Sequence, residues 1–385
     1  MSTPKEQANE RSRICAIMPQ ASSIHSADSP PTFCQRQKGA PFSCERKSGR
    51  SFTASAPCKL ILTGEHFAVW GSGSICVPIE MRNSATVTAT GKPGFALRRD
   101  WGWTDLSLPF GEVDARAHFL KGTYDTLCRI AGKPITGFEA NIPITSNPKG
   151  IGNSSSVSAA FAAAALKSCG LKLSQKNLFD CAHAADLVAH GGSASGVDAR
   201  TVTFGKPILF RKRFNPDKFS FRKIQVNMAS DMSIILIDTF HKDKCTTKEQ
   251  IAKFAASWGM DKAPSDCTEG ERDLVVREYE PISRDLLLEF SQKKPSPARI
   301  GKLFLENQDL LSRHGVSTPA MDSFIQESVD SGFAWGGKLT GAGGVGGSII
   351  ILAKKAKAQD VFSMAYSRGF GPYEVEISRK GIAFE

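Results

Sequence analysis

Apolar runs rich in β-branched and aromatic residues divide the chain into strand-like blocks. Residues 51–66 form one such run, which ends in a Thr-Gly-Glu-His turn, and residues 74–90 carry a strand signal twice over. Residues 200–214 are predicted to return to strand. Further along, residues 232–240 predict a buried strand and residues 347–353 predict another strand.

Two helical segments lie between these blocks in the first half of the chain. Residues 154–170 place serines at the start, alanines in the interior and Gly170 at the end, which is the order that a helix favours. Residues 173–192 predict a second helix, which is stopped by Gly191 and Gly192.

The pattern changes near Asn227, where a buried strand begins and several helices follow. We therefore predict one domain over residues 53–228 and a second over residues 229–385. Because both contain strands and helices, the fold class is α+β. Residues 1–52 are rich in Ser, Pro, Gln and Arg and lack periodicity, so a disordered extension is expected there.

The composition is that of an ordinary globular protein, with 385 residues, 41% of them hydrophobic and 23% charged. No apolar run approaches the roughly 20 residues that span a bilayer, so no membrane partner is expected. The net charge of +11 suits anionic ligands, but no basic cluster interleaved with aromatic residues indicates a nucleic-acid partner. We expect a solvated basic surface.

Cysteine usage and the N-terminal segment bear on location. The ten cysteines are scattered singly with no CxxC pair, which favours free thiols in a reducing compartment over disulfides or zinc. The Arg and Ser content of residues 1–52 is typical of an organelle transit peptide, but their four acidic residues argue against one. A cytoplasmic location is therefore expected.

The first candidate site is the glycine-rich segment in front of the alanine-rich helix. The first N–H groups of a helix have no internal partner, and glycines let a phosphate approach the backbone. In Gly150-Ile151-Gly152-Asn153-Ser154-Ser155, serine hydroxyls could also ligate the Mg²⁺ of a nucleotide. The segment lacks the Gly-Lys-Ser/Thr of a Walker loop, and a flexible turn with a serine N-cap is the alternative.

The second candidate site lies in residues 183–205. Asp186 is one helical turn from both His183 and His190, and Asp198 follows a glycine-rich turn. Two carboxylates near a phosphate loop suggest a metal ligand and a base for a substrate hydroxyl. A solvated helix edge and a simple turn residue are the alternative.

The third candidate site is the glycine-rich loop that begins at Gly341. Its sequence matches GxGxxG formally, but a strand rather than a helix follows, so a dinucleotide site is excluded. Such a loop can still wrap around a substrate.

In their order, "APCKLILTGEH", "GIGNSSSVSAA", "SGVDARTVTFG" and "KLTGAGGVGGS" resemble the successive motifs of the GHMP kinase superfamily, and among its members the mevalonate kinases most. The resemblance runs from about Phe52 to the C-terminus. It implies an N-terminal domain like domain 2 of ribosomal protein S5 and a ferredoxin-like C-terminal domain. It also implies that ATP and substrate meet between them.

The resemblance further implies roles for individual residues. Asp198 matches a catalytic base, and Lys59 matches a lysine beside it that would lower its pKa and neutralise charge. Ser154, with Ser155 as the alternative, and Asp186 match Mg²⁺ ligands. The expected nucleotide-binding residues are Lys149, Gly150, Ile151, Gly152, Asn153, Ser154, Ser155 and Ser156. The expected substrate-binding residues are Glu65, His66, Ser195, Gly341, Ala342, Gly343 and Gly344.

This chain departs from the motifs at several positions. Cys58 replaces a glycine, Asn153 replaces a serine or glycine, and "NPK" at residues 147–149 lengthens the approach to the phosphate loop. Asp186 stands where Glu is usual. Arg200 would lie on the same face as Asp198 in an extended segment, which suggests a phosphate contact.

The resemblance predicts ATP-dependent, Mg²⁺-dependent phosphorylation of the 5-hydroxyl of mevalonate in isoprenoid synthesis, by an enzyme with relatives that are often homodimers. Two alternatives stay open. One is a GHMP kinase for phosphomevalonate or a related acid or sugar, and the other is a catalytically silent GHMP-fold metabolite sensor.

Overall fold

The computed structural model describes residues 42–43, 49–145, 147–148, 150–192, 194–214, 218–241 and 246–385. The described residues all belong to one compact unit that runs from Gly39 to Glu385, and a separate unit comprises residues 1–38. Most of the predicted disordered extension, and Lys149 of the predicted phosphate loop, therefore lie outside the described residues.

The larger of the main sheets has eight strands and is built on two long ones. Its strands are β2 (Ser51–Thr63), β3 (Ser74–Ala89), β4 (Phe95–Arg99), β5 (Gly102–Asp105), β7 (Phe138–Asn141), β8 (Ile208–Arg213), β9 (Lys218–Lys223) and β14 (Ala383–Phe384). Their order is β14-β2-β3-β7-β4-β5, and β8 pairs with β3 and β9. The two strand signals of residues 74–90 form one continuous strand, which pairs antiparallel with β2. A two-stranded parallel sheet joins β1 (Phe42–Ser43) to β6 (Ile135–Thr136).

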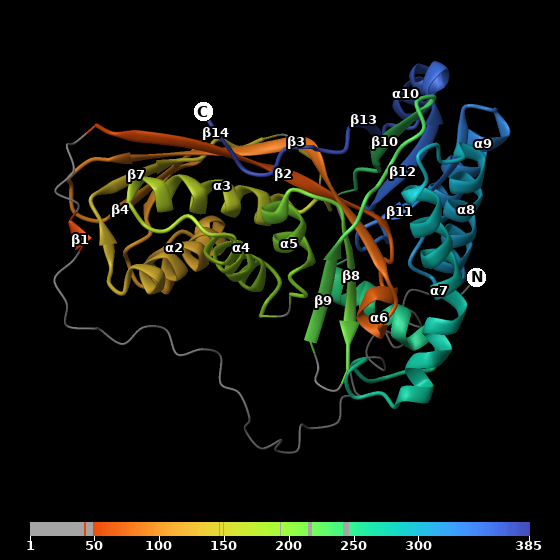
Figure 1. Ribbon diagram of the computed structural model, residues 1–385, viewed down its shortest axis with the longest axis horizontal. Coiled ribbons are helices and arrows are strands. Elements are labelled where there is room, and N and C mark those ends of the chain that lie inside the picture. Colours follow the sequence, from red (N-terminus) through yellow and green to blue (C-terminus); the bar gives the residue numbers. More distant parts are fainter. Residues whose placement is uncertain are drawn as a thin grey trace, which may run out of the picture. The chain divides into compact units, whose positions relative to one another are not determined.

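Four helices accompany this sheet: α2 (His118–Ala131), α3 (Asn153–Ser168), α4 (Gln175–Ala189) and α5 (Val197–Phe204). Helix α3 packs on β2 and β3, and α2 and α4 pack against it on the side away from the sheet (Figure 1). Alanines dominate α3, and its residues from 155 to 166 are all buried. These small side chains let the helix lie close to its neighbours, so its first turn has a fixed position beside β2.

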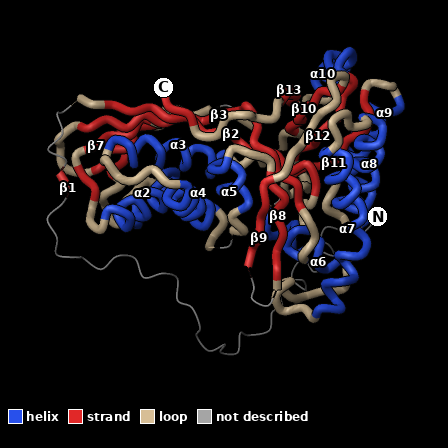
Figure 2. The backbone as a smooth tube through the Cα atoms, in the orientation of Figure 1, coloured by secondary structure: helices blue, strands red, loops and turns tan. Residues whose placement is uncertain are grey.

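The second main sheet has four antiparallel strands in the order β11-β12-β10-β13. They are β10 (Met232–Asp238), β11 (Ala334–Thr340), β12 (Ser348–Lys354) and β13 (Gly371–Val375). Helices α6 (Thr247–Ser257), α7 (Glu269–Ser291), α8 (Pro297–Arg313) and α9 (Pro319–Asp330) lie between β10 and β11 in the chain, and α10 (Ala358–Ser367) precedes β13 (Figure 2). This β-α-β-β-α-β order confirms the ferredoxin-like prediction.

Four short 3₁₀ helices complete the described elements, of which η2 (Phe67–Trp70) follows three residues after β2. The others are η3 (Phe110–Glu112), η4 (Ala115–Ala117) and η5 (Lys355–Lys357). Among the described residues, no helix is both long and apolar enough to cross a membrane.

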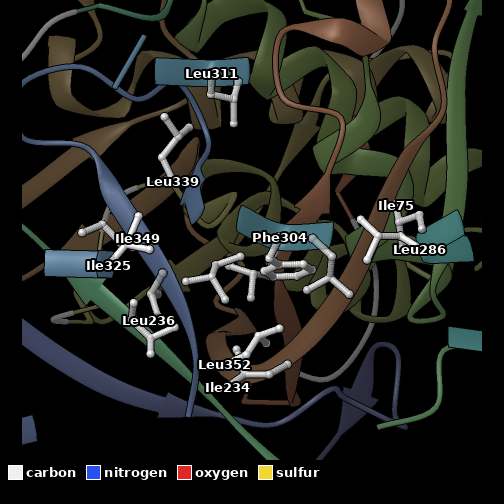
Figure 3. Packing of buried hydrophobic residues seen from close by; sticks show 14 of the residues in the cluster. Ile75, Ile234, Leu236, Leu286, Phe304, Leu311, Ile325, Leu339, Ile349 and Leu352 are labelled. Atoms are coloured by element: carbon white, nitrogen blue, oxygen red, sulfur yellow. The ribbon is translucent and has the colours of Figure 1, made fainter. Parts of the chain in front are cut away.

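The largest cluster of buried hydrophobic residues joins β10, β11 and β12 to helices α7, α8 and α9. Phe304 of α8, Leu339 of β11 and Ile349 of β12 are fully buried in it (Figure 3). Ile75 and Val77 of β3 belong to the same cluster, so the first sheet and the second share a core. This shared core determines where the ends of β2 and β11 lie.

The prediction of strand over residues 200–214 was wrong for its first part. Residues Val197–Phe204 form α5, and the strand β8 begins only at Ile208. Gly196 precedes the helix with a left-handed backbone (φ 75°), and Thr201 and Thr203 donate their hydroxyl protons to carbonyls four residues earlier. Burial of α5 against α4 and β2 outweighs the β-propensity of its threonines and valines.

The closest approach of helix α8 to strand β11 depends on a glycine. A Cβ at Gly301 would lie 2.2 Å from the carbonyl oxygen of Trp335, so the helix could not stay where it is. We expect Gly301→Ala to lower the free energy of unfolding by about 1–3 kcal/mol through overpacking, measured by urea denaturation.

Gly270, near the start of α7, is the matched control, because nothing lies within 4 Å of a Cβ placed there. Gly270→Ala should leave stability unchanged or raise it by up to about 1 kcal/mol. Equal effects of the two substitutions would contradict the close approach.

Candidate active site

Lys59 and Asp198 form an ion pair between β2 and the first turn of α5. The Lys59 Nζ atom lies 3.1 Å from Asp198 Oδ1, and the side chains are 4% and 22% exposed. Burial lowers the pKa of Lys59, but the nearby negative charges, that of Asp198 above all, outweigh burial and raise it overall. A charged lysine therefore stands beside a carboxylate that solvent can still reach.

Lys59 also holds the glycine-rich segment in front of α3. Its backbone N–H donates to the Ile151 carbonyl (2.8 Å) and its Nζ donates to the Gly150 carbonyl (3.3 Å). Gly152 has φ 70°, and a Cβ there would lie 2.9 Å from Lys59 Cγ, so this position requires glycine. Both carbonyls point toward the lysine, and Gly150 is exposed.

The prediction of a serine N-cap for α3 was wrong. Gly152 is the N-cap residue, without a side-chain hydrogen bond. Instead, Ser154 Oγ and Ser155 Oγ donate to Asp186 Oδ1 (3.0 Å) and Oδ2 (2.5 Å). Because no side chain caps the helix, its first N–H groups keep their capacity to bind an anion.

Asp186 lies on α4 with its side chain toward the start of α3. Burial above all, together with the charge of Asp198, raises the pKa of its carboxyl to about 7, although the serine hydroxyls lower it in part. A carboxylate with serine hydroxyls supplies only oxygen donors, which is the ligand chemistry of Mg²⁺. No group of three or more His, Cys, Asp or Glu within the described ranges could hold a metal ion. Mg²⁺ fits a site of this kind when substrate phosphates and water complete its coordination.

The glycine-rich loop that begins at Gly341 lies against the glycine-rich segment in front of α3. A Cβ at Gly341 would be 3.6 Å from the carbonyl oxygen of Gly150, so segments nearly 200 residues apart meet here. The next residue, Ala342, accepts a hydrogen bond from His66 Nε2 (2.9 Å). His66 has φ 62°, and burial lowers the pKa of its imidazole to about 4.

The two following glycines face the protein interior. A Cβ at Gly343 would lie 2.3 Å from the Val316 carbonyl oxygen, and one at Gly344 would lie 2.6 Å from Gln250 Nε2. The Gly344 N–H donates to the same Val316 carbonyl (2.8 Å). These contacts give both glycines a packing role, and their predicted contact with substrate stays a prediction.

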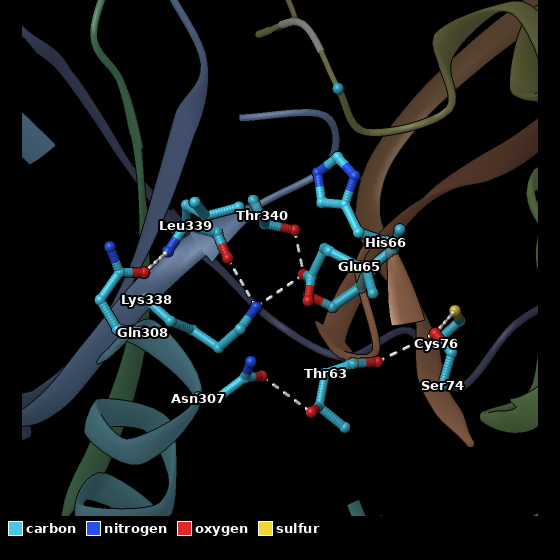
Figure 4. Close-up of polar contacts among 12 residues, drawn as sticks. Thr63, Glu65, His66, Ser74, Cys76, Asn307, Gln308, Lys338, Leu339 and Thr340 are labelled. Carbon is cyan, nitrogen blue, oxygen red and sulfur yellow. Dashed lines mark hydrogen bonds and ion pairs between the residues drawn. The ribbon is translucent and has the colours of Figure 1, made fainter. Parts of the chain in front are cut away.

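Glu65 is locked in a buried ion pair with Lys338 of β11. Lys338 Nζ lies 2.6 Å from Glu65 Oε1, and neither side chain is exposed (Figure 4). Burial raises the pKa of Glu65 and lowers that of Lys338. The pair joins the segment after β2 to the strand before the third loop, so it positions both. The predicted substrate role of Glu65 stays a prediction.

The two predicted serines that remain differ in their contacts. Ser195 Oγ accepts from the Val197 N–H at the start of α5 (3.4 Å), close in sequence to Asp198. Ser156 is fully buried, and its hydroxyl donates to the Ala56 carbonyl (2.8 Å), which ties α3 to β2. The side chain of Ser156 therefore has a structural contact, and it is not directed at a ligand.

The expectation for Arg200 was wrong, because α5 is a helix. Two residues along a helix are about 200° apart, so Arg200 and Asp198 lie on opposite faces. The guanidinium lies 3.4 Å from the ring centre of Phe179 on α4 and 4.3 Å from that of Phe221 on β9. Arg200 thus joins α5 to its neighbours by cation–π stacking.

Sequence reasoning missed two residues that support the site. Lys338 is the partner of Glu65, and Gln308 Oε1 accepts the Leu339 N–H (2.7 Å) next to it. A lysine in the otherwise uncharged strand AWGGKLT was a signal for a buried pair. Gln308 left no comparable signal, because its contact depends on how α8 packs on β11.

The family comparisons agree with this arrangement. The model described as "GHMP kinases N terminal domain" matches residues 118–206, and the model "GHMP kinases C terminal" matches residues 286–370. Both domains of the GHMP kinases are therefore matched within this chain.

Curated relatives narrow the sequence similarity to the mevalonate kinases, and solved structures share the fold. The chain is 29% identical over 332 residues to the mevalonate kinase of Archaeoglobus fulgidus, covering 86% of this chain and 99% of the relative. It is 26% identical over 354 residues to that of Pyrococcus furiosus, covering 86% and 98%. The Methanococcus jannaschii mevalonate kinase structure has the same fold, with a TM-score of 0.70, 21% identity and coverage of 87% and 100%. The chain is thus similar to mevalonate kinases in sequence and in fold.

The stacked position of Arg200 generates a prediction. Arg200→Ala should leave the Michaelis constants for both substrates within about twofold, because the side chain stacks on the face of α5 away from Asp198. It should lower the free energy of unfolding by about 1–2 kcal/mol through loss of the cation–π contacts. Steady-state kinetics and urea denaturation measure the two effects. A large rise in either Michaelis constant would instead support a contact between Arg200 and a phosphate.

The buried imidazole of His66 predicts a pH dependence of stability. Its folded pKa of about 4 lies below the unfolded value of about 6.5, so the unfolded state binds the proton more readily between them. Stability should therefore fall as the pH drops from about 6.5 to 4, with a His66 contribution of about 1–3 kcal/mol. His66→Gln should have a shallower loss over this window in urea denaturation. Parallel curves for the two proteins would contradict the buried, neutral imidazole.

Proposed function

We propose that this protein transfers the γ-phosphoryl group of ATP to the 5-hydroxyl of mevalonate. The observation that carries the proposal is the Lys59–Asp198 pair, which lies at the foot of one glycine-rich segment while a second packs beside it. A reachable carboxylate and a fixed positive charge, next to free helix N–H groups, suit phosphoryl transfer to an alcohol.

In this proposal Asp198 accepts the proton of the attacking hydroxyl. Lys59 keeps the Asp198 side chain in place, since opposite charges about 4 Å apart attract by roughly 4 kcal/mol at an effective dielectric of 20. Lys59 also offers positive charge toward the transferred group. General-base assistance of this kind contributes typically 10²–10⁴-fold.

The start of α3 would hold the phosphates. The N–H groups from Gly152 to Ser155 precede the first intrahelical bond, which the Ser156 N–H donates to the Gly152 carbonyl. The positive end of the helix dipole favours an anion there. Asp186 and Ser154 would hold Mg²⁺, which when bound neutralises charge on the phosphates. The segment from Gly341 closes the other side of the same region through its contact with Gly150.

Mevalonate is the favoured acceptor because the relatives that match almost their whole length are mevalonate kinases. A structural neighbour at 21% identity and a TM-score of 0.66 is the Leishmania major mevalonate kinase in complex with R-mevalonate. Another GHMP small-molecule kinase is the alternative acceptor class. A silent metabolite sensor is less well supported, because Lys59, Asp198, Ser154 and Asp186 are all present and in contact as pairs. Cytoplasmic location and a homodimer stay predictions.

The acceptor is tested by coupled ADP release over mevalonate, phosphomevalonate, homoserine and galactose. Mevalonate should give the highest kcat/KM. A higher value for another alcohol would transfer the proposal to that acceptor, and no ADP release with any of the four would favour the sensor.

The base is tested by Asp198→Asn. This change preserves shape but removes the proton acceptor, so kcat should fall about 10²–10⁴-fold. Asp309→Asn is the control, because Asp309 forms an exposed pair with Arg313 on α8. Wild-type kcat in Asp198→Asn would overturn the assignment.

A further inference from the structure

Three sequence features that set this chain apart from the GHMP motifs meet at one place. Cys58 at the β2 bulge lies 95 residues before Asn153 in the chain, but in space it contacts Asn153, whose side chain also contacts Asn147 and the Pro148 carbonyl. Asn83 of β3 completes the cluster. Contacts of this kind are expected when the residues together hold one local structure in place.

The Asn153 side chain is the centre of this cluster. Its Nδ2 donates to the Pro148 carbonyl at 2.7 Å, the shortest bond of the group. Its Oδ1 accepts from Asn83 Nδ2 (3.4 Å), Asn147 Nδ2 (3.5 Å) and the Cys58 thiol (3.4 Å). The amide is therefore fixed at both ends.

The supporting side chains are themselves held in the interior. Asn83 is 1% exposed, and its Oδ1 accepts from Thr145 Oγ1 (2.5 Å). Cys58 is fully buried, and burial raises the pKa of its thiol to about 12, so it stays protonated and available as a donor. The oxygen of Asn153 thus faces donors only.

The bond to Pro148 closes the glycine-rich segment from its N-terminal side. Lys59 already holds the carbonyls of Gly150 and Ile151, and helix α3 fixes the residues after Gly152. Pro148 has no N–H of its own to donate, so its carbonyl is the backbone group through which this end can be held. Because Pro148 and Gly152 are both held, the distance between them is fixed next to the helix N-terminus.

We infer that Asn153 is a positioning residue of the nucleotide site, which ties Pro148 to the start of α3 in the arrangement that receives polyphosphate. This inference rests on the proposed function. The side chain points back to its own loop and does not need to touch the nucleotide. Without the Asn153 side chain, Pro148 should no longer be held in place. Nucleotide binding would then have to order this loop first, so the affinity for nucleotide should fall.

Asn153→Ala tests the inference through the separation of kinetic constants. The Michaelis constant for ATP should rise about tenfold, while that for mevalonate and kcat at saturating ATP stay within twofold. Asn153→Asp retains the acceptor oxygen but loses the donor to Pro148, so it should raise the same constant at least as much. Asn83→Ala, which keeps the Pro148 bond, should have a smaller effect.

Asn177 on α4 offers a matched control. Its Nδ2 donates to the Lys172 carbonyl at 2.8 Å, also five residues earlier, at an exposed helix start. Asn177→Ala should leave the constant for ATP unchanged. An unchanged constant in Asn153→Ala, or an equal rise in Asn177→Ala, would overturn the inference.

Thiol reactivity gives a readout that is independent of turnover. Cys58 should react slowly with iodoacetamide in the wild type and faster in Asn153→Ala, as followed by peptide mass spectrometry. Cys181, which is buried in α4, should stay protected in both and reports that the variant is folded. Equal Cys58 rates would count against the inference.

Calorimetry with Mg·ADP separates the two levels of the proposal. If the wild type binds Mg·ADP but releases no ADP with any alcohol, the proposed function fails while the loop is still tested by the weaker binding of Asn153→Ala. If the wild type turns over mevalonate and Asn153→Ala binds Mg·ADP as tightly as the wild type, the inference alone fails.

Discussion

The rest of the site depends on the position of Lys59. One residue in β2 binds the Ile151 carbonyl through its backbone, the Gly150 carbonyl through its ammonium, and Asp198 through the same ammonium. Lys59 therefore holds a strand, a loop and a helix in fixed positions relative to one another. Because the lysine is buried, its charge cannot be screened by water and must be met by these partners. That requirement fixes the distance between the glycine-rich segment and the carboxylate.

The two buried lysines of the site serve different ends. Lys338 and Glu65 are wholly enclosed and neutralise each other, which suits a joint between two sheets. Lys59 is enclosed while its partner Asp198 is partly exposed, which leaves a carboxylate able to meet a ligand. A pair with both partners buried holds its surroundings in place, whereas a pair with one partly exposed partner leaves that partner able to react with a ligand. The same contrast separates Ser156, bonded to the strand behind it, from Ser154 and Ser155, which are bonded to Asp186.

Much of the fold followed from local pattern. The helices α3 and α4 and the strands β2, β10 and β12 lie where alanine runs, glycine stops and apolar runs predicted them. Helix α5 did not, because threonine and valine favour strand and only burial against α4 and β2 decides for helix. That error also misplaced Arg200, since the face a side chain takes depends on the period of its element. The serine cap failed because Gly152 occupies the N-cap position, so Ser154 and Ser155 lie inside the first turn of α3 and donate to Asp186.

The sequence by itself determined which groups could carry chemistry: a lysine, two aspartates, a serine run and two glycine-rich segments, each in a recognisable order. It did so because residue type and spacing along the chain are local properties. Only the tertiary structure decided which of these groups meet, that Glu65 is closed off by Lys338, and that Asn153 turns back to Pro148. These outcomes depend on the packing of strands and helices distant in sequence. A lone lysine in an otherwise uncharged strand can indicate a buried pair, but the residues beside it do not show which partner it meets.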